Sequence, residues 1–242
     1  EITINHTING VVKNEDVDYY EFNATKDQRI SLEIEAIRLS GPLFDPYIAI
    51  LDSNRFEIAT SDDTELLLQD STLSTIIPKT GKYFLEVRES SYQGGNNYYY
   101  RLHIGDFPRP LIAFPSGGQA GKLLEVTFMG DPTGPIKKKI QLPSKENLGF
   151  GYRVEQNGSI APAPNAIRVC EFPSILENEP NDTIRTANVT ELTLPLAFDG
   201  IIEKEKDVDN FKFKAKKGHK FNIYAHAQSI GSPLDPVLNL YD

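Results

Sequence analysis

The sequence is poor in several residue types that mark common classes of protein. One cysteine among 242 residues excludes a disulfide within the chain. The 34 acidic and 25 basic residues give a net charge of −9, which disfavours nucleic acid because such binding depends on clustered Lys and Arg. No apolar run approaches the length of about 18 residues typical of a membrane span. We therefore predict no nucleic-acid partner and no membrane span.

Residue patterns for catalysis are also missing. The sequence has no Gly-x-Ser-x-Gly elbow, His-Glu-x-x-His helix, dinucleotide glycine fingerprint or phosphate-binding loop. None of the four histidines lies in a recognisable motif. The single cysteine, Cys170, lies in the apolar run 167–172, which favours a buried structural thiol over a nucleophile. We predict that the chain is not an enzyme.

An internal repeat organises the chain. Residues 16–22, Asp-Val-Asp-Tyr-Tyr-Glu-Phe, recur as residues 207–213, Asp-Val-Asp-Asn-Phe-Lys-Phe, at an offset of 207 − 16 = 191. A Gly followed by two β-branched residues precedes each segment, at Gly10 and Gly200. Because the matches keep their order, they predict two copies of one structural unit.

Each copy shows the alternation of a β-strand. In the first copy Ile30, Leu32 and Ile34 alternate with polar residues, and Phe221 and Ile223 do so in the second. A period of two predicts strands with one buried face. Residues 47–51 are more uniformly apolar, which predicts a central strand. Together with evenly spaced turn residues, these patterns predict an all-β fold of jelly-roll-like antiparallel β-sandwiches.

The two copies differ in length. The first continues past Asp52 through further strands, whereas the second, aligned one residue shorter from 235 onwards (242 − 52 = 190), reaches only the equivalent residue, Asp242. An incomplete sandwich exposes strand edges, so we expect either a longer polypeptide or a partner chain to complete it. The predicted domains are a complete sandwich at 1–108, a small β-domain at 109–174 and a truncated sandwich at 175–242.

The middle domain resembles the immunoglobulin-like TIG/IPT domains. Residues 110–130 contain a Pro-flanked strand, a Gly-Gly turn and a strand with Val-Thr, as those domains do. This resemblance implies a small immunoglobulin-like β-domain between the two sandwiches.

Both copies resemble the bacterial pre-peptidase C-terminal (PPC) domain. The resemblance rests on the leader 177–183, Glu-Asn-Glu-Pro-Asn-Asp-Thr, on 207–209 with Phe213, and on 233–236, Pro-Leu-Asp-Pro. It implies a non-catalytic jelly-roll β-sandwich of secreted proteins, often placed beside a peptidase. The first copy lacks the acidic leader.

The same resemblance implies a calcium site. In the related collagen-binding modules of clostridial collagenases, the acidic leader and an acidic pair on the following strand hold calcium. Calcium takes roughly six to eight hard oxygen ligands, which closely spaced carboxylates and an amide can supply. The alternative is a turn with solvated glutamates. Carried over by position, the ligands are Glu177, Glu179, Asn181, Asp182, Asp207 and Asp209.

The counterparts in the first copy are the weaker candidates for a metal site. Asp16 and Asp18 have no acidic leader near them in the sequence, so we expect solvated turn carboxylates there. Tyr92 and 98–100 could form an aromatic platform for a ligand, although alternating strand tyrosines more often divide between core and surface.

The predicted function is therefore that of a binding or accessory module in a secreted, cell-surface or periplasmic bacterial protein. We expect the module to be calcium-stabilised, to grip a protein or polysaccharide, and to act with further domains of the same polypeptide. The alternative is a structural spacer, or an export or processing domain removed after secretion.

Overall fold

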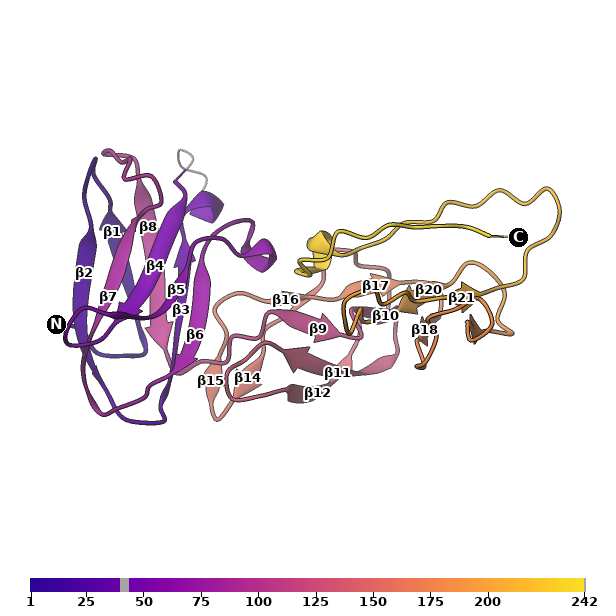
Figure 1. The fold of residues 1–242 in the computed structure, drawn as a ribbon, viewed down its shortest axis with the longest axis horizontal. Coiled ribbons are helices and arrows are strands. Elements are labelled where there is room, and N and C mark those ends of the chain that lie inside the picture. The colour runs from indigo at the N-terminus through magenta and orange to yellow at the C-terminus, as the bar shows by residue number, and fades with distance from the viewer. Residues whose placement is uncertain (40–43, 242) are drawn as a thin grey trace.

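The computed structural model describes residues 1–39 and 44–241, which form β-strands joined by loops and short 3-10 turns (Figure 1). The predicted all-β fold class is confirmed. A β-sandwich, a middle unit and a C-terminal unit follow one another along the chain. No helical segment in the described residues is long and apolar enough to cross a membrane. Residues 40–43 and Asp242, which belong to the predicted first and last domains, lie outside the described part.

The first unit is a sandwich of two four-stranded antiparallel sheets, ordered β1-β8-β3-β6 and β2-β7-β4-β5. Alternation on β7 buries Tyr83, Leu85 and Val87 between the sheets, as period-two patterning requires. The predicted central strand is confirmed, because β4 lies between β7 and β5. The elements are β1 (His6–Val11), β2 (Asp18–Ala24), β3 (Arg29–Glu35), η1 (Ile37–Leu39), β4 (Pro46–Leu51), β5 (Glu57–Ser61), η2 (Glu65–Leu67), β6 (Thr72–Ile76), β7 (Gly81–Glu89) and β8 (Tyr99–Gly105).

Strand β3 departs from the prediction that only one of its faces is buried. Its apolar residues face the sandwich core, yet the polar residues Arg29, Ser31 and Glu33 are buried as well. The second face is covered by the segment that leaves β8 and by the middle unit, since the Ser31 hydroxyl donates to the carbonyl of Phe107. The polar pattern of β3 therefore marks an interface between units.

Two crossed ion pairs join the sandwich to the middle unit. The Arg29 guanidinium donates to both carboxylate oxygens of Asp131, at 3.1 and 3.2 Å. In the opposite direction, Arg109 lies 3.2 Å from Glu33, and both side chains are fully buried. Burial acts to raise the pKa of Asp131, but hydrogen bonds from Thr133 and the Arg109 amide, with the charge of Arg29, bring it below its ordinary value.

The middle unit has its own hydrophobic core, which includes Val126, Phe128, Val154 and Val169. Strands β9, β11 and β12 form an antiparallel sheet, and β10 pairs in parallel with β17. Cys170 is buried at the end of β17, as predicted. The strands are β9 (Ile112–Phe114), β10 (Gly117–Gln119), β11 (Leu123–Met129), β12 (Ile136–Gln141), β13 (Gly151–Tyr152), β14 (Glu155–Gln156), β15 (Ser159–Ile160), β16 (Asn165–Ala166) and β17 (Arg168–Cys170).

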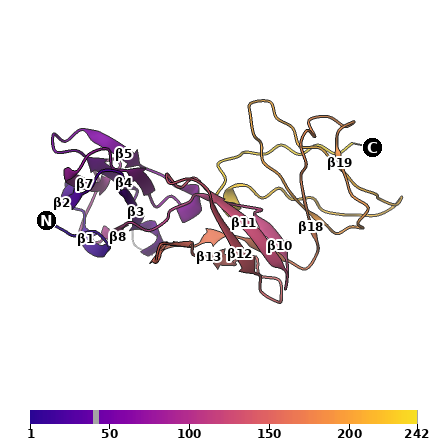
Figure 2. The ribbon, with the colours of Figure 1, turned by 90° about the horizontal axis from the view of Figure 1, so that it is seen from below.

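The C-terminal unit consists mainly of long loops (Figure 2). Its strands form two short parallel pairs, β18 with β20 and β19 with β21. The predicted strand over 221–228 is wrong, because residues 221–226 have no regular structure. The elements are β18 (Ser174–Leu176), β19 (Asn188–Val189), β20 (Ala197–Asp199), β21 (Phe211–Lys212) and η3 (Gln228–Ile230).

Three of these C-terminal elements nevertheless fall on their counterparts in the first copy. At the offset of 191, η3 maps onto η1, since 228 − 37 = 191 and 230 − 39 = 191. Strand β21 maps within β2, since 211 − 191 = 20. Strand β20 maps onto the start of β1, since 197 − 191 = 6. The positions of these elements follow the sequence repeat, although no second sandwich forms in the described residues.

We expect Asp131→Asn to lower the free energy of unfolding by about 3 kcal/mol, because it leaves the buried Arg29 guanidinium without its charged partner. Chemical denaturation of the full chain measures the change. The control is Glu125→Gln, which removes an exposed ion pair with Lys139 and should leave stability unchanged. Equal stability of Asp131→Asn and the native chain would show that the crossed ion pairs do not hold the two units together.

Candidate metal centre

The acidic leader is held against the start of the second copy by short parallel strand pairs. Because β18 pairs with β20, Glu177 follows β18 beside Gly200, which follows β20. The backbone amide of Glu177 donates to the carbonyl of Asp199 at 2.9 Å. On the other side, the amide and side chain of Asn210 both donate to the Asn181 carbonyl. Residues 22 positions apart (199 − 177) and 29 positions apart (210 − 181) are thus fixed side by side.

Three carboxylates converge at this point. Glu177, Glu179 and Asp209 each offer an oxygen, and these oxygens all lie within 4.8 Å of one another. Gly200 forms the wall of the cluster, because an added Cβ would lie 2.3 Å from Asp209 Oδ2 and 2.7 Å from Glu177 Oε2. The repeat-flanking glycine therefore provides the space that the carboxylates occupy.

Backbone amides orient the carboxylates and leave one oxygen of each without a partner. Glu177 Oε1 accepts from the Ile201 amide at 2.5 Å, and Glu179 Oε2 accepts from the Asn181 amide at 2.8 Å. Asp207 Oδ2 accepts from the Glu203 amide at 2.6 Å. The second oxygens of all three are buried and have no hydrogen-bond partner among the described residues. Buried acceptors of this kind are costly, and a cation would satisfy them.

Asn181, two residues after Glu179 in the chain, carries a neutral amide that is also buried. Its residue exposure is 0%, and neither polar atom of its side chain has a hydrogen-bond partner within the described chain. Asp209 Oδ1 is likewise buried without a partner. Since native proteins pair nearly all buried polar groups, this concentration of unpaired oxygens indicates a ligand site.

The pKa values of two carboxyl groups in the cluster are raised, so their negatively charged forms are disfavoured. Burial, followed by the proximity of Asp209 and Glu179, raises the pKa of Glu177 to about 7. Burial also raises the pKa of Asp209, with Asp207, Glu179 and Asp182 adding to the shift. Both shifts mean that the ionised forms are disfavoured in the absence of a positive charge.

The six predicted ligands divide into an inner and an outer group. Glu177, Glu179 and Asp209 converge, and Asn181 is buried close to them in the chain. The other two are not among the three that converge: the Asp182 side chain is 39% exposed, with Lys204 Nζ at 3.8 Å, and Asp207 contributes only the buried, unpaired Oδ1 described above.

Sequence reasoning missed the role of Gly200 in the site. Gly200 was noted only because it recurs in the repeat, although its lack of a side chain makes room for the carboxylates. The neighbouring Asp199, whose pKa burial raises to about 6, is oriented towards the middle unit, because its Oδ1 accepts from the Ser116 amide. The shared glycine was a usable signal for the first residue, whereas only the tertiary structure shows the contact of the second.

The equivalent position in the first copy is closed by a tyrosine. Asp18, the counterpart of Asp209, accepts a hydrogen bond from the Tyr100 hydroxyl at 2.5 Å, and that hydroxyl contacts Tyr20 at 2.5 Å. The Tyr100 ring also lies against Gly10, where an added Cβ would clash with it, whereas Gly200 in the second copy lies against the carboxylates of Glu177 and Asp209. The prediction of a solvated turn carboxylate is wrong for Asp18, because it lies half-buried within β2.

The tyrosines do not form one aromatic platform. Tyr100 is buried, with Tyr98 packed against the core, whereas Tyr99 and Tyr92 are exposed. The cluster thus divides between core and surface, as strand alternation dictates. This division removes the predicted platform as a ligand site.

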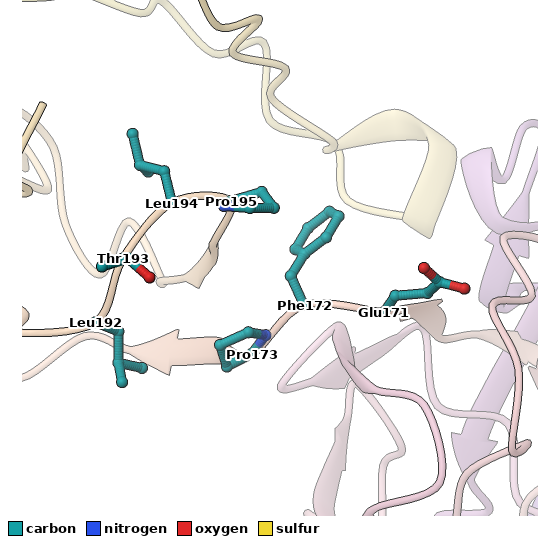
Figure 3. A pocket seen from close by; sticks show the side chains of 7 residues that line it. All are labelled: Glu171, Phe172, Pro173, Leu192, Thr193, Leu194 and Pro195. Carbon is teal, nitrogen blue, oxygen red and sulfur yellow. The ribbon is translucent and has the colours of Figure 1, made fainter. Parts of the chain in front are cut away.

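A separate hollow of 390 Å³ lies between the segments 171–173 and 192–195, where the middle unit passes into the C-terminal unit (Figure 3). Its walls are mostly Phe, Pro and Leu side chains, and Glu171 is the single titratable residue in the lining. The hollow therefore offers no pair of acid and base groups.

Comparison with known proteins finds a family match within the first unit. The family model of the bacterial pre-peptidase C-terminal domain matches residues 16–89, which lie within the first sandwich. The resemblance of the first copy to PPC domains is thus confirmed, and that of the second copy stays a prediction. No curated protein matches the chain.

Solved structures with some similarity cover less than half of the chain. The pre-peptidase C-terminal domain of a Bacillus anthracis collagenase is 20% identical, with a TM-score of 0.33, over 43% of this chain and 90% of that chain. The periplasmic g-type lysozyme inhibitor PliG of Aeromonas hydrophila is 16% identical, with a TM-score of 0.29, over 41% and 84%. PliG of Salmonella Typhimurium is 19% identical, with a TM-score of 0.29, over 42% and 88%.

We expect Tyr100→Phe to destabilise the sandwich by about 2 kcal/mol, because it leaves the half-buried Asp18 carboxylate without its hydroxyl donor. The loss should be the same in calcium and in chelator, since a tyrosine closes this position. Denaturant unfolding under both conditions measures it. Tyr99→Phe, at an exposed neighbouring position, is the matched control. A calcium-dependent difference for Tyr100→Phe would show that the first copy also binds the ion.

Proposed function

We propose that this chain is a non-catalytic accessory module of an exported bacterial multidomain protein. In this proposal calcium stiffens the C-terminal unit, and the sandwich offers a face for a protein or polysaccharide ligand. The match of residues 16–89 to the PPC family supports the accessory role and the exported location.

The calcium part of the proposal is carried by the unpaired buried oxygens of the cluster. Glu177, Glu179 and Asp209 bring three carboxylates within 4.8 Å, and the Asn181 amide is fully buried beside them in sequence. A divalent cation would supply the missing partner of each oxygen and offset the burial and the nearby negative charges that raise the pKa of Glu177.

The chemistry of the donors favours calcium over other metals. All the converging groups are oxygen donors, which suit hard cations, and the cluster includes no histidine or cysteine. Calcium accepts flexible geometry and roughly six to eight oxygens, whereas magnesium requires a near-ideal octahedron and retains several waters. Carboxylates that are oriented by backbone amides and come from separate parts of the chain suit the flexible coordination of calcium.

The ligand-binding part rests on the outer face of the sheet β2-β7-β4-β5. Arg88 lies over the rings of Tyr47 and Tyr92, with its guanidinium 3.8 and 4.6 Å from their centroids. Arg55 lies over Tyr19 at 5.0 Å and over Phe84 at 5.4 Å. Arginine and aromatic residues are enriched in the centres of protein interfaces. This arginine–aromatic face supports a ligand-binding role for the sandwich.

A spacer role is the second candidate, and a different observation favours it. The crossed ion pairs between Arg29 and Asp131 and between Arg109 and Glu33 fix the sandwich to the middle unit. A rigid connection of this kind holds attached domains at a constant separation without any ligand.

We expect the chain to bind one calcium ion in isothermal titration calorimetry, with a rise in stability of about 2.7 kcal/mol when calcium is at 100 times its Kd. Both effects should disappear in Glu179→Gln combined with Asp209→Asn, because these changes remove two converging charges while keeping side-chain size. Thermal melting in calcium and in chelator provides the second measurement.

The control for the calcium experiment is Glu191→Gln in the same unit. Glu191 pairs with Lys214 on the surface, with 78% of its side chain exposed, so calcium binding should remain. Saturable heat that survives the double substitution would place the ion elsewhere, and no heat with the native chain would remove calcium from the proposal.

We expect the arginine–aromatic face to mediate ligand binding. Depletion assays with insoluble polysaccharides and an array of extracellular proteins should show retention of the native chain, reduced at least about tenfold in Arg55→Ala combined with Arg88→Ala. Lys139→Ala, on an exposed strand of the middle unit, is the control. Equal retention of the double variant, or no retention of the native chain, would favour the spacer role.

A further inference from the structure

A short backbone segment, 199–201, holds Glu177 at two points. The carbonyl of Asp199 accepts from the Glu177 amide at 2.9 Å, and the Ile201 amide donates to Glu177 Oε1 at 2.5 Å. Between these two contacts, Gly200 lies against the carboxylates of the cluster and leaves no room for a Cβ. The position of 199–201 therefore sets both the position of the Glu177 carboxylate and the shape of the cluster.

The same segment is attached to the middle unit by the side chain of Asp199. Asp199 Oδ1 accepts a hydrogen bond from the backbone amide of Ser116 at 3.1 Å. Ser116 directly precedes β10 of the middle unit, and β18 of the C-terminal unit lies against that strand (Figure 1). This side chain thus links the backbone that holds Glu177 to the middle unit.

Ser116 is itself fixed within the middle unit. Its carbonyl accepts from the Arg168 amide at 2.9 Å, beside the parallel pairing of β10 with β17. Its hydroxyl donates to the Ala113 carbonyl at 3.0 Å. Because these two further bonds hold Ser116, its amide is a fixed donor that can anchor Asp199 and the segment that follows.

Asp199 lies outside the group of converging carboxylates. That group consists of Glu177, Glu179 and Asp209, whereas Asp199 directs its Oδ1 to the middle unit. Its contact with the site runs through its own backbone carbonyl, which accepts from the Glu177 amide. Residues that orient metal ligands without touching the metal commonly change metal affinity by about 10- to 100-fold when they are substituted.

We propose that Asp199 is a positioning residue of the calcium site and that, through it, calcium binding is coupled to the middle unit. In this inference, which rests on the calcium site proposed above, the bond to Ser116 holds 199–201 where Glu177 can meet the ion. Coupling between two sites is reciprocal. The middle unit therefore strengthens calcium binding, and bound calcium keeps the contact between Asp199 and Ser116 closed.

The alternative role of Asp199 is electrostatic, because a nearby negative charge attracts a cation without fixing any backbone. Two substitutions separate the roles. Asp199→Asn removes the charge and keeps an oxygen that can accept from the Ser116 amide, whereas Asp199→Ala removes both. A loss of calcium affinity confined to Asp199→Ala would indicate positioning, and equal losses in the two variants would indicate charge.

Isothermal titration calorimetry of the full chain with calcium chloride measures the affinity. We expect Asp199→Ala to weaken calcium binding about tenfold, because segment 199–201 then loses its anchor on the middle unit. Asp199→Asn, the matched control, should stay within about twofold of the native chain because its oxygen still accepts from Ser116. Circular dichroism of both variants checks that the fold is retained.

Hydrogen exchange followed by NMR tests the coupling without any substitution, so it decides the question even if Asp199→Ala fails to fold. We expect the Ser116 amide of the native chain to exchange at least about tenfold more slowly with calcium than with chelator, because the ion holds its acceptor in place. The control is the Gly95 amide, which donates to the Val12 carbonyl in the first sandwich and should exchange equally under both conditions.

The possible results separate this inference from the calcium site itself. Native-like calcium affinity in folded Asp199→Ala, or equal weakening in both variants, would overturn the positioning role. A native chain that binds calcium without slower exchange at Ser116 would leave the calcium site standing and overturn the coupling. No heat of calcium binding with the native chain would remove the calcium site and this inference together.

Discussion

Backbone pairing between the two halves of the sandwich is the constraint on which this molecule depends. In the first copy each of the strands β1 to β4 pairs only with strands of the set β5 to β8, so both halves are needed to form the two sheets. Together the eight strands close around one core. In the C-terminal unit β20 and β21, which map onto β1 and β2, pair instead with β18 and β19.

Buried charged groups have different neighbours at two places in the chain. At the junction of sandwich and middle unit, Arg29 meets Asp131 and Arg109 meets Glu33, so each buried charge has an opposite partner. At the acidic leader, Glu177 and Asp209 face each other without a cation from the protein. The first arrangement stabilises an interface, whereas the second requires either protonation or a bound cation. The contrast separates a structural contact from a candidate ligand site.

Much of the local structure could be predicted from residue patterns. The alternation in β7, the central position of β4 and the buried Cys170 follow from apolar periodicity, because side chains on a strand point alternately to opposite faces. The acidic cluster was also predicted in part, since Glu177 and Glu179 lie two residues apart on an extended leader. The role of Gly200 was missed because it depends on the close approach of Glu177 and Asp209 from other parts of the chain.

Two aspartates at equivalent positions of the repeat show the limit of what the sequence alone can predict. Asp18 and Asp209 lie in the same motif, yet one accepts a hydrogen bond from Tyr100 and the other faces Glu177. The sequence by itself determined the all-β class, the repeat and the set of acidic residues, because these depend on local periodicity and residue type. Only the tertiary structure decided which carboxylates converge, which face of β3 is covered and which strands lack partners. Those outcomes depend on contacts between residues that are distant in the chain, and local patterns do not specify such contacts.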